Sequence, residues 1–132
     1  MPSPLTTRPE LLAPAGDYDA LVAAVNNGAD AVYLGLEEMN ARRGAANFDL
    51  ESLVEATRFA HLRGVNVYLT ANTLVLPDEM QAALAMVDAA WAAGVDAVIV
   101  QDLGLIEVLR TALPQVRLHA STQLGAMNPG TI

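Results

Sequence analysis

The 132-residue sequence contains no cysteine and no lysine. The lack of cysteine excludes a disulfide framework, a thiol nucleophile and a thiolate-held metal or iron–sulfur cluster within these residues. Aromatic residues make up only 5% of the chain, so alanine, valine and leucine must build the core. The sequence has neither the glycine fingerprint of dinucleotide-binding proteins nor a phosphate-binding P-loop. It therefore gives no support to a dinucleotide site or to a P-loop phosphate site.

Positive charge is also scarce, because seven arginines face fifteen acidic residues and leave a net charge of −8. Proteins that bind nucleic acid normally present a basic face. We therefore expect this segment to repel nucleic acid unless Arg42 and Arg43 form a locally positive pocket. The first nine residues lack the apolar core of a signal peptide, and no run approaches the ~18 apolar residues of a membrane span. These observations predict a cytoplasmic protein with no membrane contact.

A short motif recurs three times in the chain. Residues 28–34 (Gly-Ala-Asp-Ala-Val-Tyr-Leu) are echoed by 94–100 (Gly-Val-Asp-Ala-Val-Ile-Val) and more weakly by 64–69. The glycines recur at intervals of roughly 30 to 36 residues, about the length of one strand–helix unit. Because glycine accepts the left-handed conformation that ends helices, each copy predicts a helix end followed by a strand.

The apolar runs predict five strands, and they are mostly continuous, as in parallel sheets covered on both faces. We place these strands at 11–13, 31–34, 65–69, 97–100 and 116–118. Four helices are expected between them. Asp17 can cap a helix over about 18–27, Asp49 can cap the second, and Pro77 can begin the third. The fourth covers about 103–112 and ends before Pro114.

This alternation predicts an α/β fold, a partial (β/α)8 or TIM-barrel-like domain with about five parallel strands and four helices. A flavodoxin-like open sheet remains as the alternative, because periodicity alone does not separate the two. Asn128-Pro129 resembles the start of a fifth helix, from which we expect the chain to be cut from something longer. We expect residues 1–9 to be a disordered arm and residues 10–132 to be the N-terminal half of the barrel.

Five strands do not close a barrel, so two sheet edges and one sheet face need a cover. The rest of the barrel or a second copy of the chain is the expected partner. In both candidate folds, ligands bind at the carboxyl ends of the strands. Catalytic residues are not assigned and no metal site is expected, but substrate contacts are predicted at Arg42, Arg43, Asn72, Gln101, His119, Ser121 and Gln123.

Each of these candidates also has a structural interpretation. Arg42 and Arg43 either clamp a carboxylate or phosphate or lie on a solvated loop. Asn72 either orients a substrate or bonds to nearby backbone, and Gln101 is left open. His119 either contacts a substrate or is a buried, hydrogen-bonded histidine at the end of a strand. His119 and Ser121 point to one face of a strand with Cα atoms about 7 Å apart, which suits a hydrolytic dyad poorly.

Other polar residues favour structural roles. Asp17 and Asp102 are expected to cap helices. His61 is expected to be a packed residue near a helix end, and two histidines without a zinc motif predict no zinc site.

Five segments, read in order, resemble the peptidase U32 family of collagenase-like proteases. They are residues 10–16, 27–35, 70–73, 94–102 and 118–123, and the resemblance covers about residues 10–125. It implies a TIM-barrel-like N-terminal domain of which this chain is the first half. Several branches of the family support hydroxylation of transfer RNA, ribosomal RNA or ubiquinone precursors. The amino-acid sequences of residues 100–104 and 119–123 most resemble those of the ribosomal RNA branch.

The resemblance also implies an iron–sulfur cluster, held by cysteines beyond the region covered here. No cofactor is expected within this segment, and no established protease nucleophile of the family maps onto it. We therefore expect a fragment, inactive alone, of a protease or of a factor for RNA hydroxylation, with a peptide or RNA substrate. The alternative is a small non-enzymatic α/β module that self-associates through its open sheet edge.

Overall fold

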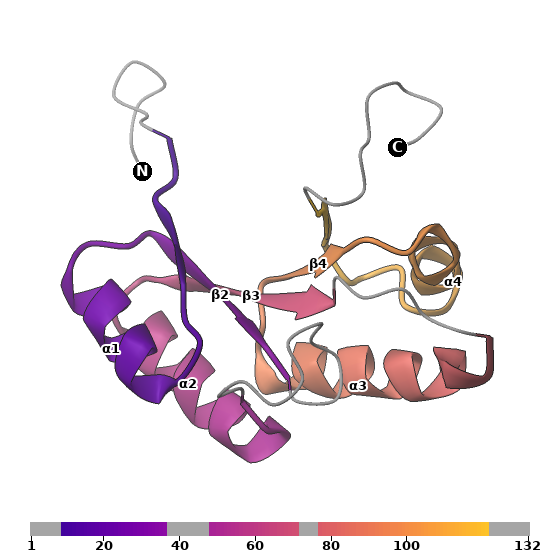
Figure 1. The fold of residues 1–132 in the computed structure, drawn as a ribbon, viewed down its shortest axis with the longest axis horizontal. Coiled ribbons are helices and arrows are strands. Elements are labelled where there is room, and N and C mark those ends of the chain that lie inside the picture. Colours follow the sequence, from indigo (N-terminus) through magenta and orange to yellow (C-terminus); the bar gives the residue numbers. More distant parts are fainter. Residues whose placement is uncertain (1–8, 37–47, 72–76, 122–132) are drawn as a thin grey trace.

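The computed structural model describes residues 9–36, 48–71 and 77–121 (Figure 1). Strands and helices alternate throughout these ranges. The strands are β1 (Leu12–Pro14), β2 (Ala31–Gly35), β3 (Asn66–Ala71), β4 (Ala97–Val100) and β5 (Leu118–Ala120). The helices are α1 (Tyr18–Asn26), α2 (Leu50–Leu62), α3 (Met80–Ala93) and α4 (Leu103–Ala112). A short 3-10 turn, Pro77–Glu79, precedes α3, so Pro77 begins this turn and not the α-helix itself.

The five strands form one sheet in the order β1-β2-β3-β4-β5, and all neighbouring pairs are parallel. Spatial order equals chain order, as in consecutive strands of a (β/α)8 barrel. A flavodoxin-like sheet has its second strand outside its first, and this alternative is therefore excluded. The sheet of the described residues is open, with β1 and β5 at its edges.

The main hydrophobic core lies between the sheet and its helices. Alternate strand residues supply the sheet side of this core, namely Val32, Leu34, Val67, Leu69, Val98 and Val100. The helices supply Leu21, Leu53, Val87 and Leu105 among others. Figure 1 shows the helices along one side of the strands. We call the opposite side of the sheet, which the described helices leave uncovered, the inner face.

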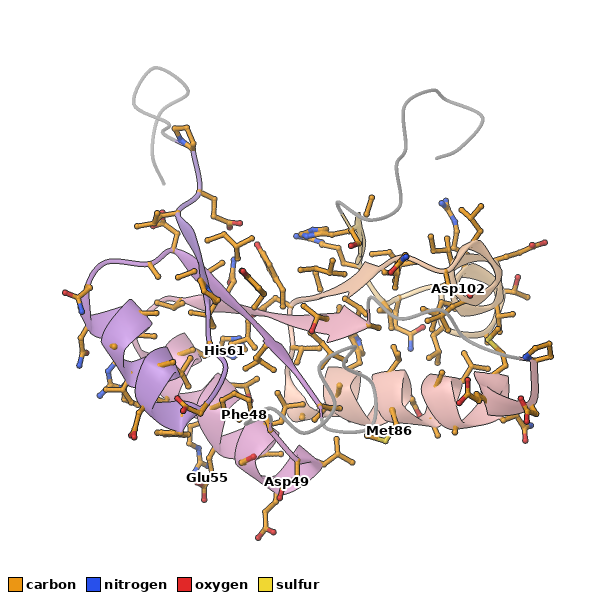
Figure 2. The ribbon with its side chains drawn as sticks, in the orientation of Figure 1. Phe48, Asp49, Glu55, His61, Met86 and Asp102 are labelled. Atoms are coloured by element: carbon orange, nitrogen blue, oxygen red, sulfur yellow. The ribbon has the colours of Figure 1, made fainter. Side chains whose placement is uncertain are left out.

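Aspartate caps account for three of the helix starts. The carboxylate of Asp17 accepts from the Ala20 N–H, and that of Asp102 accepts from the Leu105 N–H, each at 2.8 Å. Asp49, at the start of α2 (Figure 2), and Ser52 cap this helix reciprocally, since each side chain accepts from the other residue's backbone N–H. All three caps were predicted.

The recurring glycine–aspartate motif has a structural explanation at the amino ends of the strands. Gly28, Gly64 and Gly94 adopt φ values of +97°, +74° and +111°, the left-handed conformation expected of them. The aspartates two residues after the first and third glycines tie neighbouring strands together. Asp30 accepts from the Leu11 N–H at 2.7 Å, and Asp96 accepts from the Val67 N–H at 2.8 Å.

The two edge strands lie slightly later in the chain than predicted. β5 begins at Leu118 because Val116 is buried and its N–H donates to the Leu113 carbonyl, within the turn that follows α4. The predicted arm at residues 1–9 lies almost wholly outside the described residues.

Candidate functional site

The inner face is built by the strand residues that alternate with the core residues, because successive side chains point to opposite sides of a strand. Register places them in two rows. The lower row contains Pro14, Tyr33, Tyr68 and Ala97. The upper row, one step nearer the carboxyl ends of the strands, contains Gly35, Thr70, Ile99 and His119.

Gln101 and Ser121 follow β4 and β5 directly, two residues beyond Ile99 and His119. The Ser121 N–H donates to the Val100 carbonyl at 2.8 Å, which holds these two chain segments side by side. Gln101 and His119 are half-buried, whereas Ser121 is buried. We call this region, defined by Thr70, Gln101, His119 and Ser121, the mouth of the sheet.

Three of the seven predicted contact residues therefore lie together at the mouth, namely Gln101, His119 and Ser121. Arg42, Arg43, Asn72 and Gln123 lie outside the described residues.

The Thr70 hydroxyl and the His119 ring of the mouth each contact another strand. Thr70 Oγ1 donates to the Leu34 carbonyl at 3.1 Å. The His119 ring lies against the Tyr68 ring, with 4.9 Å between centroids and 75° between planes. This edge-on packing places the His119 ring against β3.

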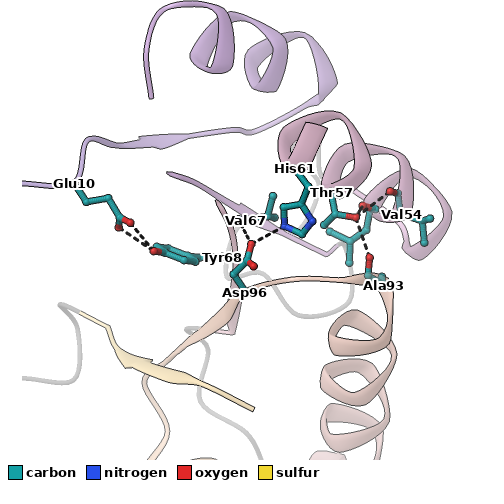
Figure 3. Close-up of polar contacts among 9 residues, drawn as sticks. Glu10, Val54, Thr57, His61, Val67, Tyr68, Ala93 and Asp96 are labelled. Atoms are coloured by element: carbon teal, nitrogen blue, oxygen red, sulfur yellow. Dashed lines mark hydrogen bonds and ion pairs between the residues drawn. The ribbon is translucent and has the colours of Figure 1, made fainter. Parts of the chain in front are cut away.

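No sequence pattern indicates a role for Tyr68 or Glu10, although their side chains make a polar contact on the inner face. The Tyr68 hydroxyl donates to the Glu10 carboxylate, 2.9 Å from both oxygens (Figure 3). Burial, followed by the hydrogen bond to Glu10, raises the pKa of Tyr68 above 10.0. Tyr68 lies in a continuous apolar run, and such a run does not show which side chains point to the inner face. Its two-residue spacing from Thr70 was the available indication.

His61 lies far from the mouth, at the end of α2 (Figure 2). It was predicted to be a packed helix-end residue, yet its side chain is 40% exposed and its Nε2 lies 2.7 Å from Asp96 Oδ2. No group of three or more potential metal-binding side chains occurs within residues 9–36, 48–71 and 77–121. None of the helices in these ranges has the length and apolar character needed to cross a membrane.

A profile described as peptidase family U32 matches residues 16–132. The chain belongs to peptidase family U32. A solved structure of a U32 peptidase shares the fold, with a TM-score of 0.70 and 19% identity over 94% of this chain and 53% of that one. At this identity the likeness concerns the fold alone.

Three curated U32-like relatives are similar in sequence. An uncharacterized protease from Methanocaldococcus jannaschii is 43% identical over 90% of this chain and 29% of its own length. The 23S rRNA 5-hydroxycytidine synthase of Escherichia coli is 41% identical over 88% of this chain and 17% of its own. A tRNA hydroxylation protein of Bacillus subtilis is 39% identical over 94% of this chain and 29% of its own length. The U32 chain thus spans less than a third of each relative.

Proposed function

We propose that this chain is part of the N-terminal, TIM-barrel-like domain of a longer U32 protein that takes part in the hydroxylation of an RNA base. Its mouth supplies contacts to that base. The observation that carries the choice is the 41% identity to an enzyme named for hydroxylated cytidine in ribosomal RNA, extending over 88% of the chain. The 39% identity to a tRNA hydroxylation protein supports the same class of substrate.

The chemistry of the mouth suits contacts to a base better than contacts to phosphates. Gln101 offers an amide donor and acceptor and His119 offers its ring nitrogens, groups of the kind that recognise base edges. The net charge of −8 opposes binding to the phosphate backbone. In this proposal, affinity for the RNA backbone comes from other parts of the protein, and this segment reads the base.

The residues of this chain do not fit an iron–sulfur cluster, because the sequence has no cysteine. If the whole protein holds such a cluster, its ligands belong to cysteines outside this chain. We further propose that additional strands of the same protein pair with the open edges β1 and β5 and cover the inner face. Such a protein would act on RNA in the cytoplasm.

A peptidase remains the second candidate, supported by the 43% identity to a relative named as an uncharacterized protease. Peptide hydrolysis by a serine or threonine requires a base within hydrogen-bond reach of the hydroxyl. Thr70 instead donates to a carbonyl group, and His119 packs against Tyr68. These contacts give no support to a hydrolytic pair of Thr70 and His119, and for this reason we rank the peptidase second.

A segment exchange tests the proposal. The matched segment of the E. coli 23S rRNA 5-hydroxycytidine synthase is replaced by this chain, in a strain that lacks the native enzyme. We expect 5-hydroxycytidine to reappear in 23S rRNA, as measured by mass spectrometry of nucleosides. His119→Ala should abolish the product, whereas His61→Gln, far from the mouth, should retain it.

Two results would contradict the proposal. One is a soluble, folded chimera that accumulates to the level of the native enzyme and yields no 5-hydroxycytidine. The other is a loss of product in His61→Gln as severe as in His119→Ala. Cleavage of gelatin by the full-length protein, abolished by a substitution at the mouth, would favour the peptidase.

A further inference from the structure

Three side chains from distant parts of the sequence make a continuous set of contacts across the inner face. Glu10 precedes β1, Tyr68 lies in the middle of β3, and His119 lies on β5. The Tyr68 hydroxyl bonds to Glu10, and the Tyr68 ring contacts the His119 ring. The set therefore connects one edge of the sheet with the other and ends at the mouth.

The contact with Glu10 fixes the position of Tyr68. The phenol donates to a carboxylate, and hydrogen bonds to charged acceptors are stronger than neutral ones. Tyr68 is only 6% exposed, whereas Glu10 is exposed, so the bond is part-buried and is anchored from the Tyr68 side. A tyrosine hydroxyl is protonated at neutral pH and can donate, and burial followed by the hydrogen bond to Glu10 raises the pKa of Tyr68 further.

The sequence of β4 allows Tyr68 to reach His119. Ala97 is the register partner of Tyr68 and packs against it. Its small side chain leaves space for the two rings to meet across β4. The rings are T-shaped at 4.9 Å, an arrangement that aromatic pairs favour because ring edges are positive and ring faces negative.

The polar atoms of His119 remain available. Within the described part of the chain, neither ring nitrogen of His119 has a hydrogen-bond partner. A half-buried imidazole normally bonds to backbone or side chains, because an unmet polar group costs free energy. A neutral imidazole offers one donor and one acceptor, and the edge of a nucleobase offers both complements.

We propose that Tyr68, held by Glu10, is a positioning residue that fixes the His119 ring so that an imidazole nitrogen contacts the edge of a planar base at the mouth. This inference rests on the proposed function for the identity of the ligand. The coupling between Tyr68 and His119 does not depend on that function and can be measured separately.

The chain contains two histidines, which makes the coupling measurable by NMR. With ¹³C-labelled histidine, the protein gives one ring signal from His119 and one from His61, assigned with His61→Gln. We expect the His119 signal to shift in Tyr68→Leu, which removes the ring, and the His61 signal to stay in place. Tyr33→Phe is the matched control, since Tyr33 is the register partner of Tyr68 on β2 and should move neither signal.

Two milder variants separate the roles of ring and hydroxyl. Tyr68→Phe keeps the ring contact, and Glu10→Ala removes only the acceptor of the hydroxyl. Each should shift the His119 signal less than Tyr68→Leu does. If both act through the one hydrogen bond, the double variant should match either single variant. These variants also serve if Tyr68→Leu does not fold.

The same substitutions in the E. coli chimera measure the functional consequence. We expect Tyr68→Leu to lower 5-hydroxycytidine about as severely as His119→Ala. Tyr68→Phe should restore much of the product, and Tyr33→Phe should leave it unchanged. A purely structural role predicts instead that product follows the amount of folded protein, whichever tyrosine is changed.

The outcomes distinguish the two proposals. An unmoved His119 signal in Tyr68→Leu, Tyr68→Phe and Glu10→Ala overturns the positioning role. So does a chimera in which folded Tyr68→Leu makes as much product as Tyr33→Phe. If the unsubstituted chimera makes no product while the His119 signal shifts as expected, the proposed function and the assigned base ligand fail and the Tyr68–His119 coupling stands.

Discussion

His61 Nε2 lies 2.7 Å from Asp96 Oδ2, and the same oxygen accepts from the Val67 N–H at 2.8 Å (Figure 3). One carboxylate thereby joins the end of α2, the start of β3 and the turn before β4. Asp30 occupies the equivalent position in the first copy of the repeat and accepts from the Leu11 N–H. The repeat thus ties the amino ends of strands together, opposite the mouth.

The first prediction concerns this junction. Asp96→Ala removes the acceptor of the partly buried Val67 N–H and should lower the free energy of unfolding by about 1–3 kcal/mol. Asp96→Asn keeps an acceptor and should cost less. The ion pair with His61 adds little, because both side chains are about a third or more exposed. Urea unfolding followed by circular dichroism measures the differences.

Asp88→Ala is the control for this junction. Asp88 is exposed on α3, and its replacement should change the free energy of unfolding by no more than about 0.5 kcal/mol. Equal effects of Asp96→Ala and Asp88→Ala would show that the carboxylate junction does not stabilise the fold.

The second prediction concerns the packing of α2 against α3. The hydroxyl of Thr57 is 2.9 Å from the carbonyl oxygens of Leu53, Val54 and Ala93, the last at the end of α3 (Figure 3). Thr57→Val should lower the free energy of unfolding by about 1–3 kcal/mol, because the buried Thr57 hydroxyl is lost and the part-buried Ala93 carbonyl loses this interhelical partner.

Thr111→Val provides the comparison in an exposed position. Thr111 Oγ1 donates to the Glu107 carbonyl on α4, where water can replace it. The expected change is within about 0.5 kcal/mol. If Thr57→Val and Thr111→Val change the free energy of unfolding equally, the interhelical bond does not have the stabilising role assigned to it.

The third prediction is a pH dependence at the start of α2. The hydrogen bond from the Ser52 N–H, followed by that from the Ser52 hydroxyl, lowers the pKa of Asp49 below 3.8. The unfolded chain therefore takes up this proton at a higher pH than the folded one. The stability that Asp49 contributes is complete above 3.8 and is lost as the pH falls through the folded pKa.

Asp49→Asn tests this dependence, because asparagine is also a good cap but carries no charge. The wild type should exceed the variant in stability at neutral pH, and the difference should shrink below pH 3.8. Denaturant titrations at a series of pH values measure this difference. A difference that is the same across the whole series would contradict the lowered pKa.

The fold was largely predictable from local chemistry. Glycines at helix ends, aspartate caps and apolar runs each act within a few residues, so Gly28, Asp17 and the run at 97–100 were sufficient to place elements. The order of the strands was not predictable from periodicity, because the TIM-barrel-like and flavodoxin-like sheets contain the same alternation of elements. The pairing of β2 with β3 decided between them, because a flavodoxin-like sheet pairs β1 with both β2 and β3.

The site was predictable only in outline. The rule that ligands bind at the carboxyl ends of parallel strands brought Gln101, His119 and Ser121 to one region. The contact of Glu10 with Tyr68 joins residues 58 positions apart and depends on register, which sequence patterns do not give. The direction of the His119 ring follows from the same long-range arrangement.

The last prediction concerns the ionisation of Tyr68. Its raised pKa means that the hydroxyl remains protonated above pH 10.0, where a solvated tyrosine ionises. Ultraviolet titration should show a component above 10.0 that Tyr68→Phe removes and Tyr33→Phe retains. Glu10→Gln should lower the midpoint, because the hydrogen bond to Glu10 and its negative charge both raise the pKa of Tyr68, after burial as the largest single cause. The unfolded chain loses this proton first, so the stability contributed by the neutral phenol is complete below 10.0 and is lost as the pH rises through the folded pKa. A titration in which Tyr68→Phe removes no late component would show that neither burial nor Glu10 holds the phenol in its neutral form.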